Sequence, residues 1–160
     1  GGYLVVPHVV SRITAPDGQV ISRFHDRAKR VLEPGTTAIF KRILSLVTQD
    51  GGTAAQAAVA GNTVSGKTGT ARLFDPRTGR YSDKYASTFV GFVPASDPKI
   101  AMIVVFKGSK GAIYGGTVAG PVFSEIAEKA FAYLNVPRDD AARNNMVYLG
   151  RSRHEVVYTP

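Results

Sequence analysis

Residues 61–70 place one lysine inside two different sequence motifs, which need different folds around that lysine. The segment Gly61-Asn-Thr-Val-Ser-Gly-Lys-Thr68 fits G-x-x-x-x-G-K-[ST], the pattern of a phosphate-binding loop. The overlapping segment Lys67-Thr-Gly-Thr70 fits a Lys-Thr-Gly element of the kind found on active-site strands. A phosphate loop follows a strand and opens a helix, whereas the second motif needs extended chain throughout. The flanking residues therefore decide between the two.

The residues on both sides of the motif argue against a phosphate loop. Residues 53–60 are helix-prone, rich in Ala and poor in the β-branched residues of a buried strand. After Thr68, Gly69 and then Asp75-Pro76 leave no room for a helix whose N–H groups would bind phosphate. The most apolar strand candidate, residues 100–106, is followed by Lys107 instead of an acidic ligand for Mg²⁺. We therefore do not expect nucleotide binding.

The Lys-Thr-Gly element instead begins a region that predicts consecutive antiparallel strands. Gly69 suits an active-site strand, because a ligand can lie close against a backbone that carries no side chain. Turn residues separate three segments that can be extended, with turns at 76–79 and 94–98 and strands at 64–73, 85–93 and 100–106. The sequence thus predicts a three-stranded sheet with Lys67 on a strand that borders a cleft.

Several longer segments resemble one protein family and occur in the family's order, namely residues 47–59, 65–71, 89–105 and 114–123. The chain resembles the C-terminal part of the transpeptidase domain of class B penicillin-binding proteins, above all the septal cell-division type of Gram-negative bacteria. This resemblance implies an α+β fold: an antiparallel sheet with flanking helices, the C-terminal portion of the penicillin-recognising serine transpeptidase fold. We expect residues 1–137 to form this part of the domain and residues 138–160 a polar C-terminal tail.

Two of the family's three active-site elements do not occur as such in the sequence. The family uses S-x-x-K, which contains the serine nucleophile, then S-x-N, then K-T-G. No Asn has a Ser two residues before it, and the S-x-x-K string Ser96-Asp-Pro-Lys99 follows Lys67 instead of preceding it. Pro98 disfavours the helical turn that would bring Ser96 and Lys99 together, so residues 96–99 predict a turn between strands. We expect a fragment that is inactive alone, with the nucleophile upstream of Gly1.

The resemblance implies roles for five residues. Lys67 would place a cation beside the nucleophile and the substrate carboxylate. The Thr68 and Thr70 hydroxyls would bind the carboxylate of a D-Ala-D-Ala peptide or a β-lactam, and the Thr70 N–H would form half of an oxyanion hole. Gly69 would let the ligand backbone approach. Tyr114 resembles the aromatic wall of the family's pocket, although a packing role fits it equally well. The predicted catalytic residues are Lys67 and Thr70, with Thr68, Gly69 and Tyr114 binding the ligand.

The implied function is peptidoglycan D,D-transpeptidation during cell division, with acylation by β-lactams. Two alternatives remain: a β-lactamase-like or penicillin-sensing domain, and a non-catalytic fragment that assembles with its N-terminal half. The expected partners are stem peptides, β-lactams and the N-terminal part of the same protein, with division proteins as further candidates. We expect no metal or cofactor. The implied location is the periplasmic face of the bacterial inner membrane, with any anchor in the N-terminal part.

The composition sets limits on other functions. The chain carries 20 Lys and Arg against 12 Asp and Glu, a formal net charge of +8. These basic residues are scattered and do not cluster on a recognition helix or alternate with aromatic residues, so we do not expect nucleic-acid binding. A basic surface suits anionic cell-wall polymer and lipid headgroups. The absence of Cys excludes disulfides and thiolate metal sites. The longest apolar run, residues 100–106, is far shorter than the ~20 residues that span a bilayer.

The remaining segments predict one hairpin and two helices. Residues 8–14 and 20–24 flank the turn sequence 15–19. A helix is expected to start after Pro34-Gly35 and to stop at residues 50–52, with one apolar face made of Ile39, Phe40, Ile43, Leu44 and Val47. A last helix is expected from about Pro121, with a buried stripe made of Phe123, Ile126, Ala127, Ala130, Phe131 and Leu134. Residues 138–145 predict a linker, and residues 146–158 a short strand or no regular structure.

Overall fold

The computed structural model describes residues 1–25 and 27–139. These residues form two compact units, the first of residues 1–40 and the second beginning at Lys41. Residues 146–158, for which a short strand or no regular structure was predicted, lie outside the described residues, as does most of the predicted tail 138–160. No helix in the described ranges is long and apolar enough to cross a membrane.

The first unit contains two short antiparallel strand pairs, β1 (Tyr3–Val5) with β4 (Ala28–Arg30) and β2 (Arg12–Thr14) with β3 (Val20–Arg23). The second pair confirms the predicted hairpin, although its strands are shorter than expected. In its turn, the Ala15 N–H donates to the Gln19 carbonyl at 2.8 Å. Gly18 has φ +87°, a backbone conformation that favours glycine.

Helix α1 (Pro34–Ser45) was predicted, but it begins slightly earlier than expected, because it includes Pro34 and Gly35. The missing N–H of Pro34 would have no partner in the first helical turn, so a proline is tolerated there. The α-helix ends earlier than expected and continues as the 3₁₀ turn η1 (Leu46–Thr48). The predicted apolar face does not form a buried face in the described structure. Ile39, Phe40 and Ile43 are each more than half exposed, and Leu44 and Val47 are half-buried.

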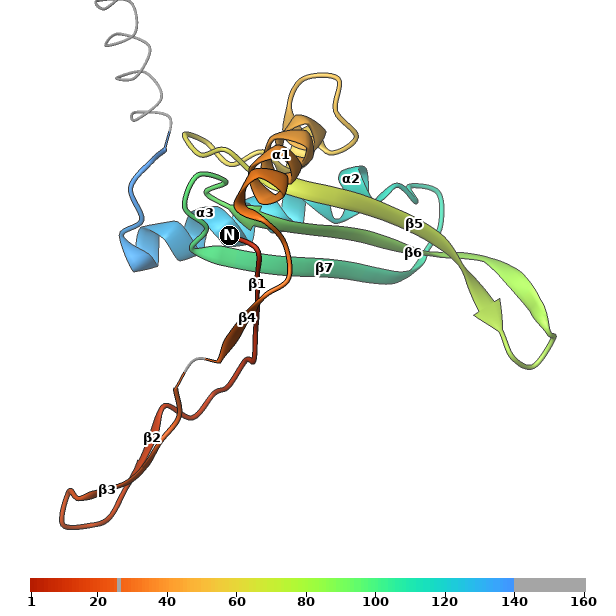
Figure 1. The fold of residues 1–160 in the computed structure, drawn as a ribbon. Helices are drawn as coiled ribbons and strands as arrows, with labels where there is room; N and C mark the ends of the chain where they lie inside the picture. Colours follow the sequence, from red (N-terminus) through yellow and green to blue (C-terminus); the bar gives the residue numbers. More distant parts are fainter. Residues whose placement is uncertain (26, 140–160) are drawn as a thin grey trace, which may run out of the picture. The chain divides into compact units, whose positions relative to one another are not determined.

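The core of the second unit is a three-stranded antiparallel sheet in the order β5-β6-β7 (Figure 1), with β5 (Ser65–Asp75), β6 (Arg80–Val93) and β7 (Ile100–Ser109). This confirms the predicted strand, turn, strand, turn, strand sequence, although each strand is longer than predicted. Because β6 lies in the middle, β5 and β7 are the two edges of the described sheet. The helix-prone segment before Gly61 forms the short 3₁₀ turn η2 (Ala55–Ala57).

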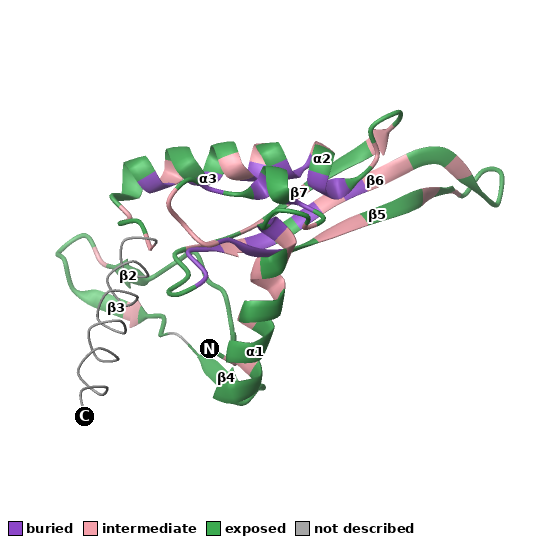
Figure 2. Ribbon diagram, turned by 90° about the horizontal axis from the view of Figure 1, so that it is seen from above, coloured by how far each residue is buried: buried purple, intermediate pink, exposed green. Residues whose placement is uncertain are grey.

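Helices α2 (Gly115–Val118) and α3 (Gly120–Leu134) cover one face of this sheet, which we call the helix face (Figure 1). Phe89 of β6 meets Phe123 of α3 edge to face, with ring centroids 4.9 Å apart, and both are fully buried. Burial alternates along the end of β6, where Ser87, Phe89, Gly91 and Val93 are buried and the residues between them are more exposed. Figure 2 shows buried segments in purple on the sheet and on α3. The α+β prediction of a sheet with flanking helices is confirmed for this unit.

The predicted buried stripe of the last helix is only partly right. Phe123, Ala127 and Phe131 are buried, and they lie four residues apart on one line along α3. Ile126 is 46% exposed and Leu134 is 53% exposed, so these two assignments were wrong. The reason is that α3 packs on the sheet along one narrow line, so residues at i+3 positions fall on its flank.

The opposite side of the sheet, which we call the open face, carries Lys67, Val90, Ile103 and Val105. The strand register aligns Lys67 with Val90 and Val90 with Ile103, so these side chains point to the same side. Val90, Ile103 and Val105 are 45%, 62% and 47% exposed. The end of α1 contacts this face at Ser65, whose hydroxyl donates to the Lys41 carbonyl at 2.9 Å.

Candidate active site

The position of Lys67 excludes a phosphate loop. Lys67 lies inside β5 and pairs in register with Val90. The chain before Gly61 is a 3₁₀ turn and not a strand, and the chain after Thr68 continues as strand to Asp75 instead of opening a helix. Within the described residues, no helix that could bind phosphate through its N–H groups therefore begins directly after Lys67.

The beginning of β5 is firmly fixed just before the Lys-Thr-Gly element. The Thr48 hydroxyl donates to the Val64 carbonyl at 2.9 Å, and both Val64 and Ser65 are buried. A β-carbon on Gly66 would overlap the ring of Phe89. Because Phe89 itself packs on α3, this close fit defines the position of β5 relative to the core.

Thr68 and Thr70 line a hollow of about 320 Å³ together with Tyr114. Both threonines lie on the helix face, because their register partners are Phe89 and Ser87. The Gly115 N–H donates to the Thr70 hydroxyl at 3.3 Å. Tyr114 is 69% exposed, so most of its ring remains accessible from solvent. The structure thus brings three of the five predicted site residues to one place.

Lys67 and Gly69 do not line this hollow, because neighbouring side chains of a strand point to opposite faces. The Lys67 side chain is exposed, and its ammonium group donates to the Thr68 carbonyl at 2.9 Å. Gly69 is half-buried. A ligand that contacts both Lys67 and the two threonine hydroxyls must therefore lie across the edge of β5, which in the described sheet pairs only with β6.

The contact of Lys67 with the Thr68 carbonyl also indicates which backbone groups face that edge. The carbonyl must point away from β6 to accept the ammonium group. In an antiparallel pair the N–H and C=O of one residue point to the same side, and every second residue repeats this direction. The Thr70 N–H accordingly points to the same free edge, which is the direction the predicted oxyanion donor needs.

Four residues of the hollow were not predicted as site residues, namely Thr53, Gly115, Gly116 and Thr117. The Thr53 and Thr68 hydroxyl oxygens are 3.4 Å apart. A β-carbon on Gly116 would overlap the Thr53 carbonyl. The two adjacent glycines Gly115 and Gly116, with which α2 begins, are visible in the sequence, but the sequence does not show which distant backbone they face.

Residues Ser96 to Lys99 form the predicted turn between β6 and β7 and not a second catalytic pair. The Ser96 hydroxyl donates to the Asp139 carboxylate at 3.0 Å, and the Ser96 carbonyl accepts from Lys41 at 2.9 Å. Lys99 donates to the Asp97 carboxylate, and this hydrogen bond and charge hold the pKa of Asp97 below its usual value. Ser96 and Lys99 thus each bind other groups.

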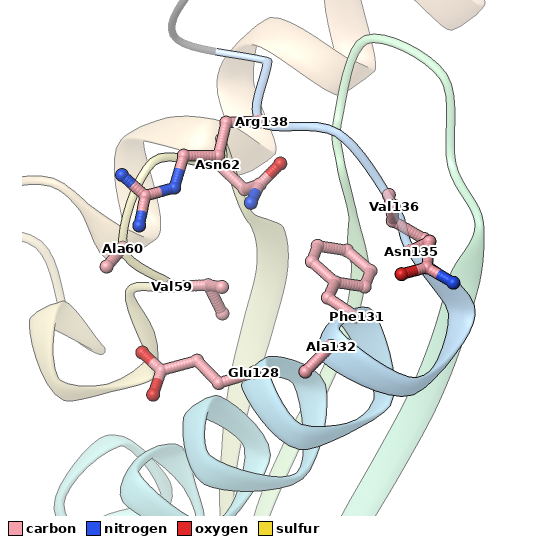
Figure 3. A pocket seen from close by; sticks show the side chains of 9 residues that line it. All are labelled: Val59, Ala60, Asn62, Glu128, Phe131, Ala132, Asn135, Val136 and Arg138. Carbon is pink, nitrogen blue, oxygen red and sulfur yellow. The ribbon is translucent and has the colours of Figure 1, made fainter.

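A hollow of about 570 Å³, larger than the one beside Thr68, lies at the C-terminal end of α3 (Figure 3). Figure 3 shows the Phe131 ring among the side chains that line it, with Glu128 and Arg138 on different sides. The Arg138 side chain occupies the space where a β-carbon on Gly61 would lie. No residue of the sheet lines this hollow, and none of the predicted site residues does, so size alone does not identify the site.

A comparison with family models decides what kind of domain carries this arrangement. The family model described as "Penicillin binding protein transpeptidase domain" matches residues 1–128. The chain belongs to the penicillin-binding protein transpeptidase family. Penicillin-binding protein PbpB of Mycolicibacterium smegmatis is 35% identical over 145 residues, covering 85% of this chain and 22% of that protein. The probable peptidoglycan D,D-transpeptidase PenA of Neisseria flavescens is 39% identical over 112 residues, covering 69% and 28%.

A solved structure of the penicillin-binding protein family has the same fold. Penicillin-binding protein 3 of Mycobacterium tuberculosis, complexed with ampicillin, has a TM-score of 0.74 and 32% sequence identity, covering 86% of this chain and 32% of that chain. The predicted family resemblance and fold are both confirmed. This transpeptidase-family chain spans between a fifth and a third of the length of the proteins named here.

Proposed function

We propose that this chain is the Lys-Thr-Gly-bearing part of a peptidoglycan D,D-transpeptidase that cross-links stem peptides during cell division and is acylated by β-lactams. The observation that carries the proposal is the edge strand β5. It presents Lys67 on one face and the Thr68 and Thr70 hydroxyls on the other, with Tyr114 beside them. Such an edge suits an extended peptide that ends in a carboxylate, because hydroxyl donors and a cation favour an anion.

In the proposed reaction, a serine from the upstream part attacks the carbonyl carbon of the penultimate D-Ala. The C–N bond to the terminal D-Ala breaks, the serine proton passes through a base to the leaving amine, and an ester remains on the serine. An amine of a neighbouring stem peptide then attacks the ester and forms the new amide, the bond between the acyl carbon and the serine oxygen breaks, and the proton lost by the amine returns to the serine. With a β-lactam, the serine attacks the ring amide in the same way, and the opened molecule stays attached to the serine as an ester.

Within this scheme, Lys67 and the edge of β5 supply the electrostatic part of catalysis. The Lys67 ammonium group favours the ionised serine and attracts the substrate carboxylate. The Thr70 N–H stabilises the oxyanion that develops on the attacked carbonyl. Thr68 and Thr70 hold the carboxylate, Gly69 allows close approach, and Tyr114 forms one wall.

The upstream part of the same polypeptide is the proposed partner of the open face. Ile103 and Val105 are 62% and 47% exposed there, on the same face as Lys67 but two strands away, and β7 has a free edge in the described sheet. Exposed apolar side chains on the face that carries the proposed catalytic cation are well placed to be covered by the segment that brings the serine. The proposed location is the periplasmic face of the inner membrane, where the peptidoglycan substrate is. Division proteins remain candidate partners without a defined contact.

The test is acylation of the polypeptide that joins this chain to its upstream part. Lys67→Ala should slow acylation by a fluorescent penicillin on the order of 10²–10³-fold, about 3–4 kcal/mol, because a cation that stabilises developing charge is lost. Lys84→Ala, an exposed lysine on β6, is the matched control and should leave the rate unchanged. A Lys67→Ala rate within about threefold of the unsubstituted protein would overturn the assignment of β5 to the active site.

The same experiment separates the transpeptidase from a β-lactamase-like relative. A transpeptidase keeps its penicilloyl ester because water is a poor second substrate at its site, whereas a β-lactamase hydrolyses the ester. Retention of the fluorescent label over hours supports the proposal. Loss of the label within minutes, with free penicilloic acid in solution, favours the β-lactamase-like alternative.

A further inference from the structure

In the described part of the chain, the hydroxyls of Thr68 and Thr70 each have one hydrogen-bond partner. The Thr70 hydroxyl accepts the Gly115 N–H at 3.3 Å. The Thr68 hydroxyl lies 3.4 Å from the hydroxyl of Thr53, which lines the same hollow. A hydroxyl has one proton to donate and two lone pairs to accept with. The Thr70 oxygen is therefore already occupied as an acceptor, which leaves its proton to donate into the hollow.

The Thr68 hydroxyl can also offer its proton to a ligand while its oxygen accepts a hydrogen bond from the protein, but only if Thr53 is the donor. The two hydroxyl oxygens are 3.4 Å apart, so in the absence of a ligand the Thr68 hydroxyl can direct its proton to the Thr53 oxygen. A ligand carboxylate is a stronger acceptor than a neutral hydroxyl, so its entry turns the Thr68 proton toward the ligand. The Thr53 hydroxyl can then rotate and donate its own proton to the Thr68 oxygen. Thr53 then donates to Thr68, and Thr68 donates to the ligand carboxylate, which is the last acceptor of this hydrogen-bond chain.

The backbone on both sides of Thr53 is held firmly enough for this task. The Ala54 N–H donates to the Val47 carbonyl at 2.8 Å, and Ala54 is 2% exposed. On the other side, the Gly52 N–H donates to the Gln49 carbonyl at 2.8 Å. Gly116 packs directly against the Thr53 carbonyl. As a β-branched residue, Thr53 also has few side-chain rotamers.

We infer that Thr53 is a positioning residue for ligand carboxylate recognition: it accepts the Thr68 proton in the empty site and donates to Thr68 when a carboxylate is bound. This inference rests on the proposed function, because it assigns the carboxylate to the Thr68 hydroxyl. It adds a residue from a segment outside the Lys-Thr-Gly strand to the determinants of specificity. Thr53 acts through Thr68 and does not itself contact the ligand.

The experiment measures acylation efficiency in the polypeptide that contains the serine, using benzylpenicillin and its methyl ester. Thr53→Val should lower the efficiency for benzylpenicillin about five- to tenfold, since it keeps the side-chain shape but removes one proton donor from a charge-assisted hydrogen-bond chain. The loss should appear in the capture constant and not in the rate of the chemical step. Thr53→Ser should retain efficiency to within about twofold, because the hydroxyl is kept.

Two further measurements distinguish positioning from a structural or direct role. With the methyl ester, which has no carboxylate, Thr53→Val should have no effect. In a Thr68→Val background, Thr53→Val should cause no further loss beyond about twofold, because the acceptor of its proton is gone. Thr78→Val in the β5–β6 turn is a matched exposed control and should leave all values unchanged.

The outcomes separate this inference from the proposed function. If Lys67→Ala slows acylation and Thr53→Val does not, the role of Thr53 is overturned and the proposed function stands. An equal loss for the ester and the acid would indicate a structural role for Thr53. A loss that persists in the Thr68→Val background would indicate direct ligand contact. Either result would overturn the positioning role. If Lys67→Ala is also without effect, the proposed function itself fails.

Discussion

Gly115 lies so close to the carbonyl oxygen of Thr88 that no β-carbon fits between them. The Gly69 carbonyl is also within reach of that missing atom, so the start of α2 rests directly on the backbone of both β5 and β6. The same residue donates its N–H to the Thr70 hydroxyl. One glycine therefore joins the helix, the sheet and a site hydroxyl.

We predict that Gly115→Ala destabilises the protein by about 1–3 kcal/mol, because the added methyl group must push rigid backbone aside. Gly69→Ala is the control on the facing strand. Its β-carbon would meet the Thr88 side chain at 3.5 Å, an ordinary contact, so stability should be kept or slightly increased. Denaturant unfolding measures both. If Gly115→Ala unfolds at the same midpoint as the unsubstituted chain, the close packing of α2 on the sheet is not rigid.

Gly69→Ala should nevertheless impair acylation in the polypeptide that contains the serine. Its methyl group would stand on the open face next to Lys67, where the ligand backbone is proposed to approach the strand. A normal acylation rate for this stable variant would show that the ligand does not lie against Gly69. Gly69→Ala is thus expected to lose activity while it keeps its stability.

Thr68→Val and Thr70→Val should have unequal effects. Thr68→Val removes a hydroxyl donor to the ligand carboxylate and should weaken capture about tenfold or more, with little change in the chemical step. Thr70→Val should affect the oxyanion less than its position suggests, because the proposed donor there is the backbone N–H. Stopped-flow acylation separates capture from chemistry, and a larger loss of the chemical step in Thr70→Val would contradict the backbone assignment.

The chain alone should form no covalent adduct with a labelled penicillin. Ser96 binds Asp139 and Lys99 binds Asp97, so the S-x-x-K string of this sequence offers no activated serine. Intact-mass spectrometry after incubation checks this, with the polypeptide that includes the upstream part as positive control. A stoichiometric mass shift on any Ser or Thr of residues 1–160 would refute the proposal that the nucleophile lies upstream.

The open face should make the isolated chain bind a hydrophobic dye and self-associate, because Ile103 and Val105 expose apolar surface beside a free strand edge. Ile103→Lys should reduce both effects without loss of stability. Val104→Lys on the same strand is the matched contrast, since the half-buried Val104 packs against the core and a charge there should destabilise the chain. A monodisperse, dye-negative chain in light scattering would mean that the sheet needs no partner.

The order of the strands was predictable because turn residues and β-branched segments are local signals. Residues 76–79 and 94–98 separated three strands in the sequence, and the structure has the same order. The last helix was harder, since its apolar residues spread wider than the single line of Phe123, Ala127 and Phe131 that reaches the sheet. Periodicity reports which residues are apolar, whereas burial depends on how much neighbouring structure is present.

The hollow around Thr68 and Thr70 could be predicted only in part. The family resemblance pointed to the threonines and to Tyr114, but not to Thr53. Thr53 is 15 residues from Thr68 in the sequence, and Gly115 is 45 residues from Thr70. Contacts over such separations follow from strand register and helix packing, which no local pattern encodes. The catalytic and binding roles of all five predicted residues remain predictions until the variants are measured.

The fit of Phe89 over Gly66 has a consequence for how the site can fail. A strand shifted by one residue would turn Lys67 toward the helices and both threonines toward the uncovered side, while keeping the same number of ladder bonds. Gly66 favours the observed alignment, since the Phe89 ring occupies the space where a β-carbon at this position would lie. A bulkier residue at position 66 would therefore penalise the observed register, and with it the assignment of Lys67 and the two threonines to their faces, without changing any site residue.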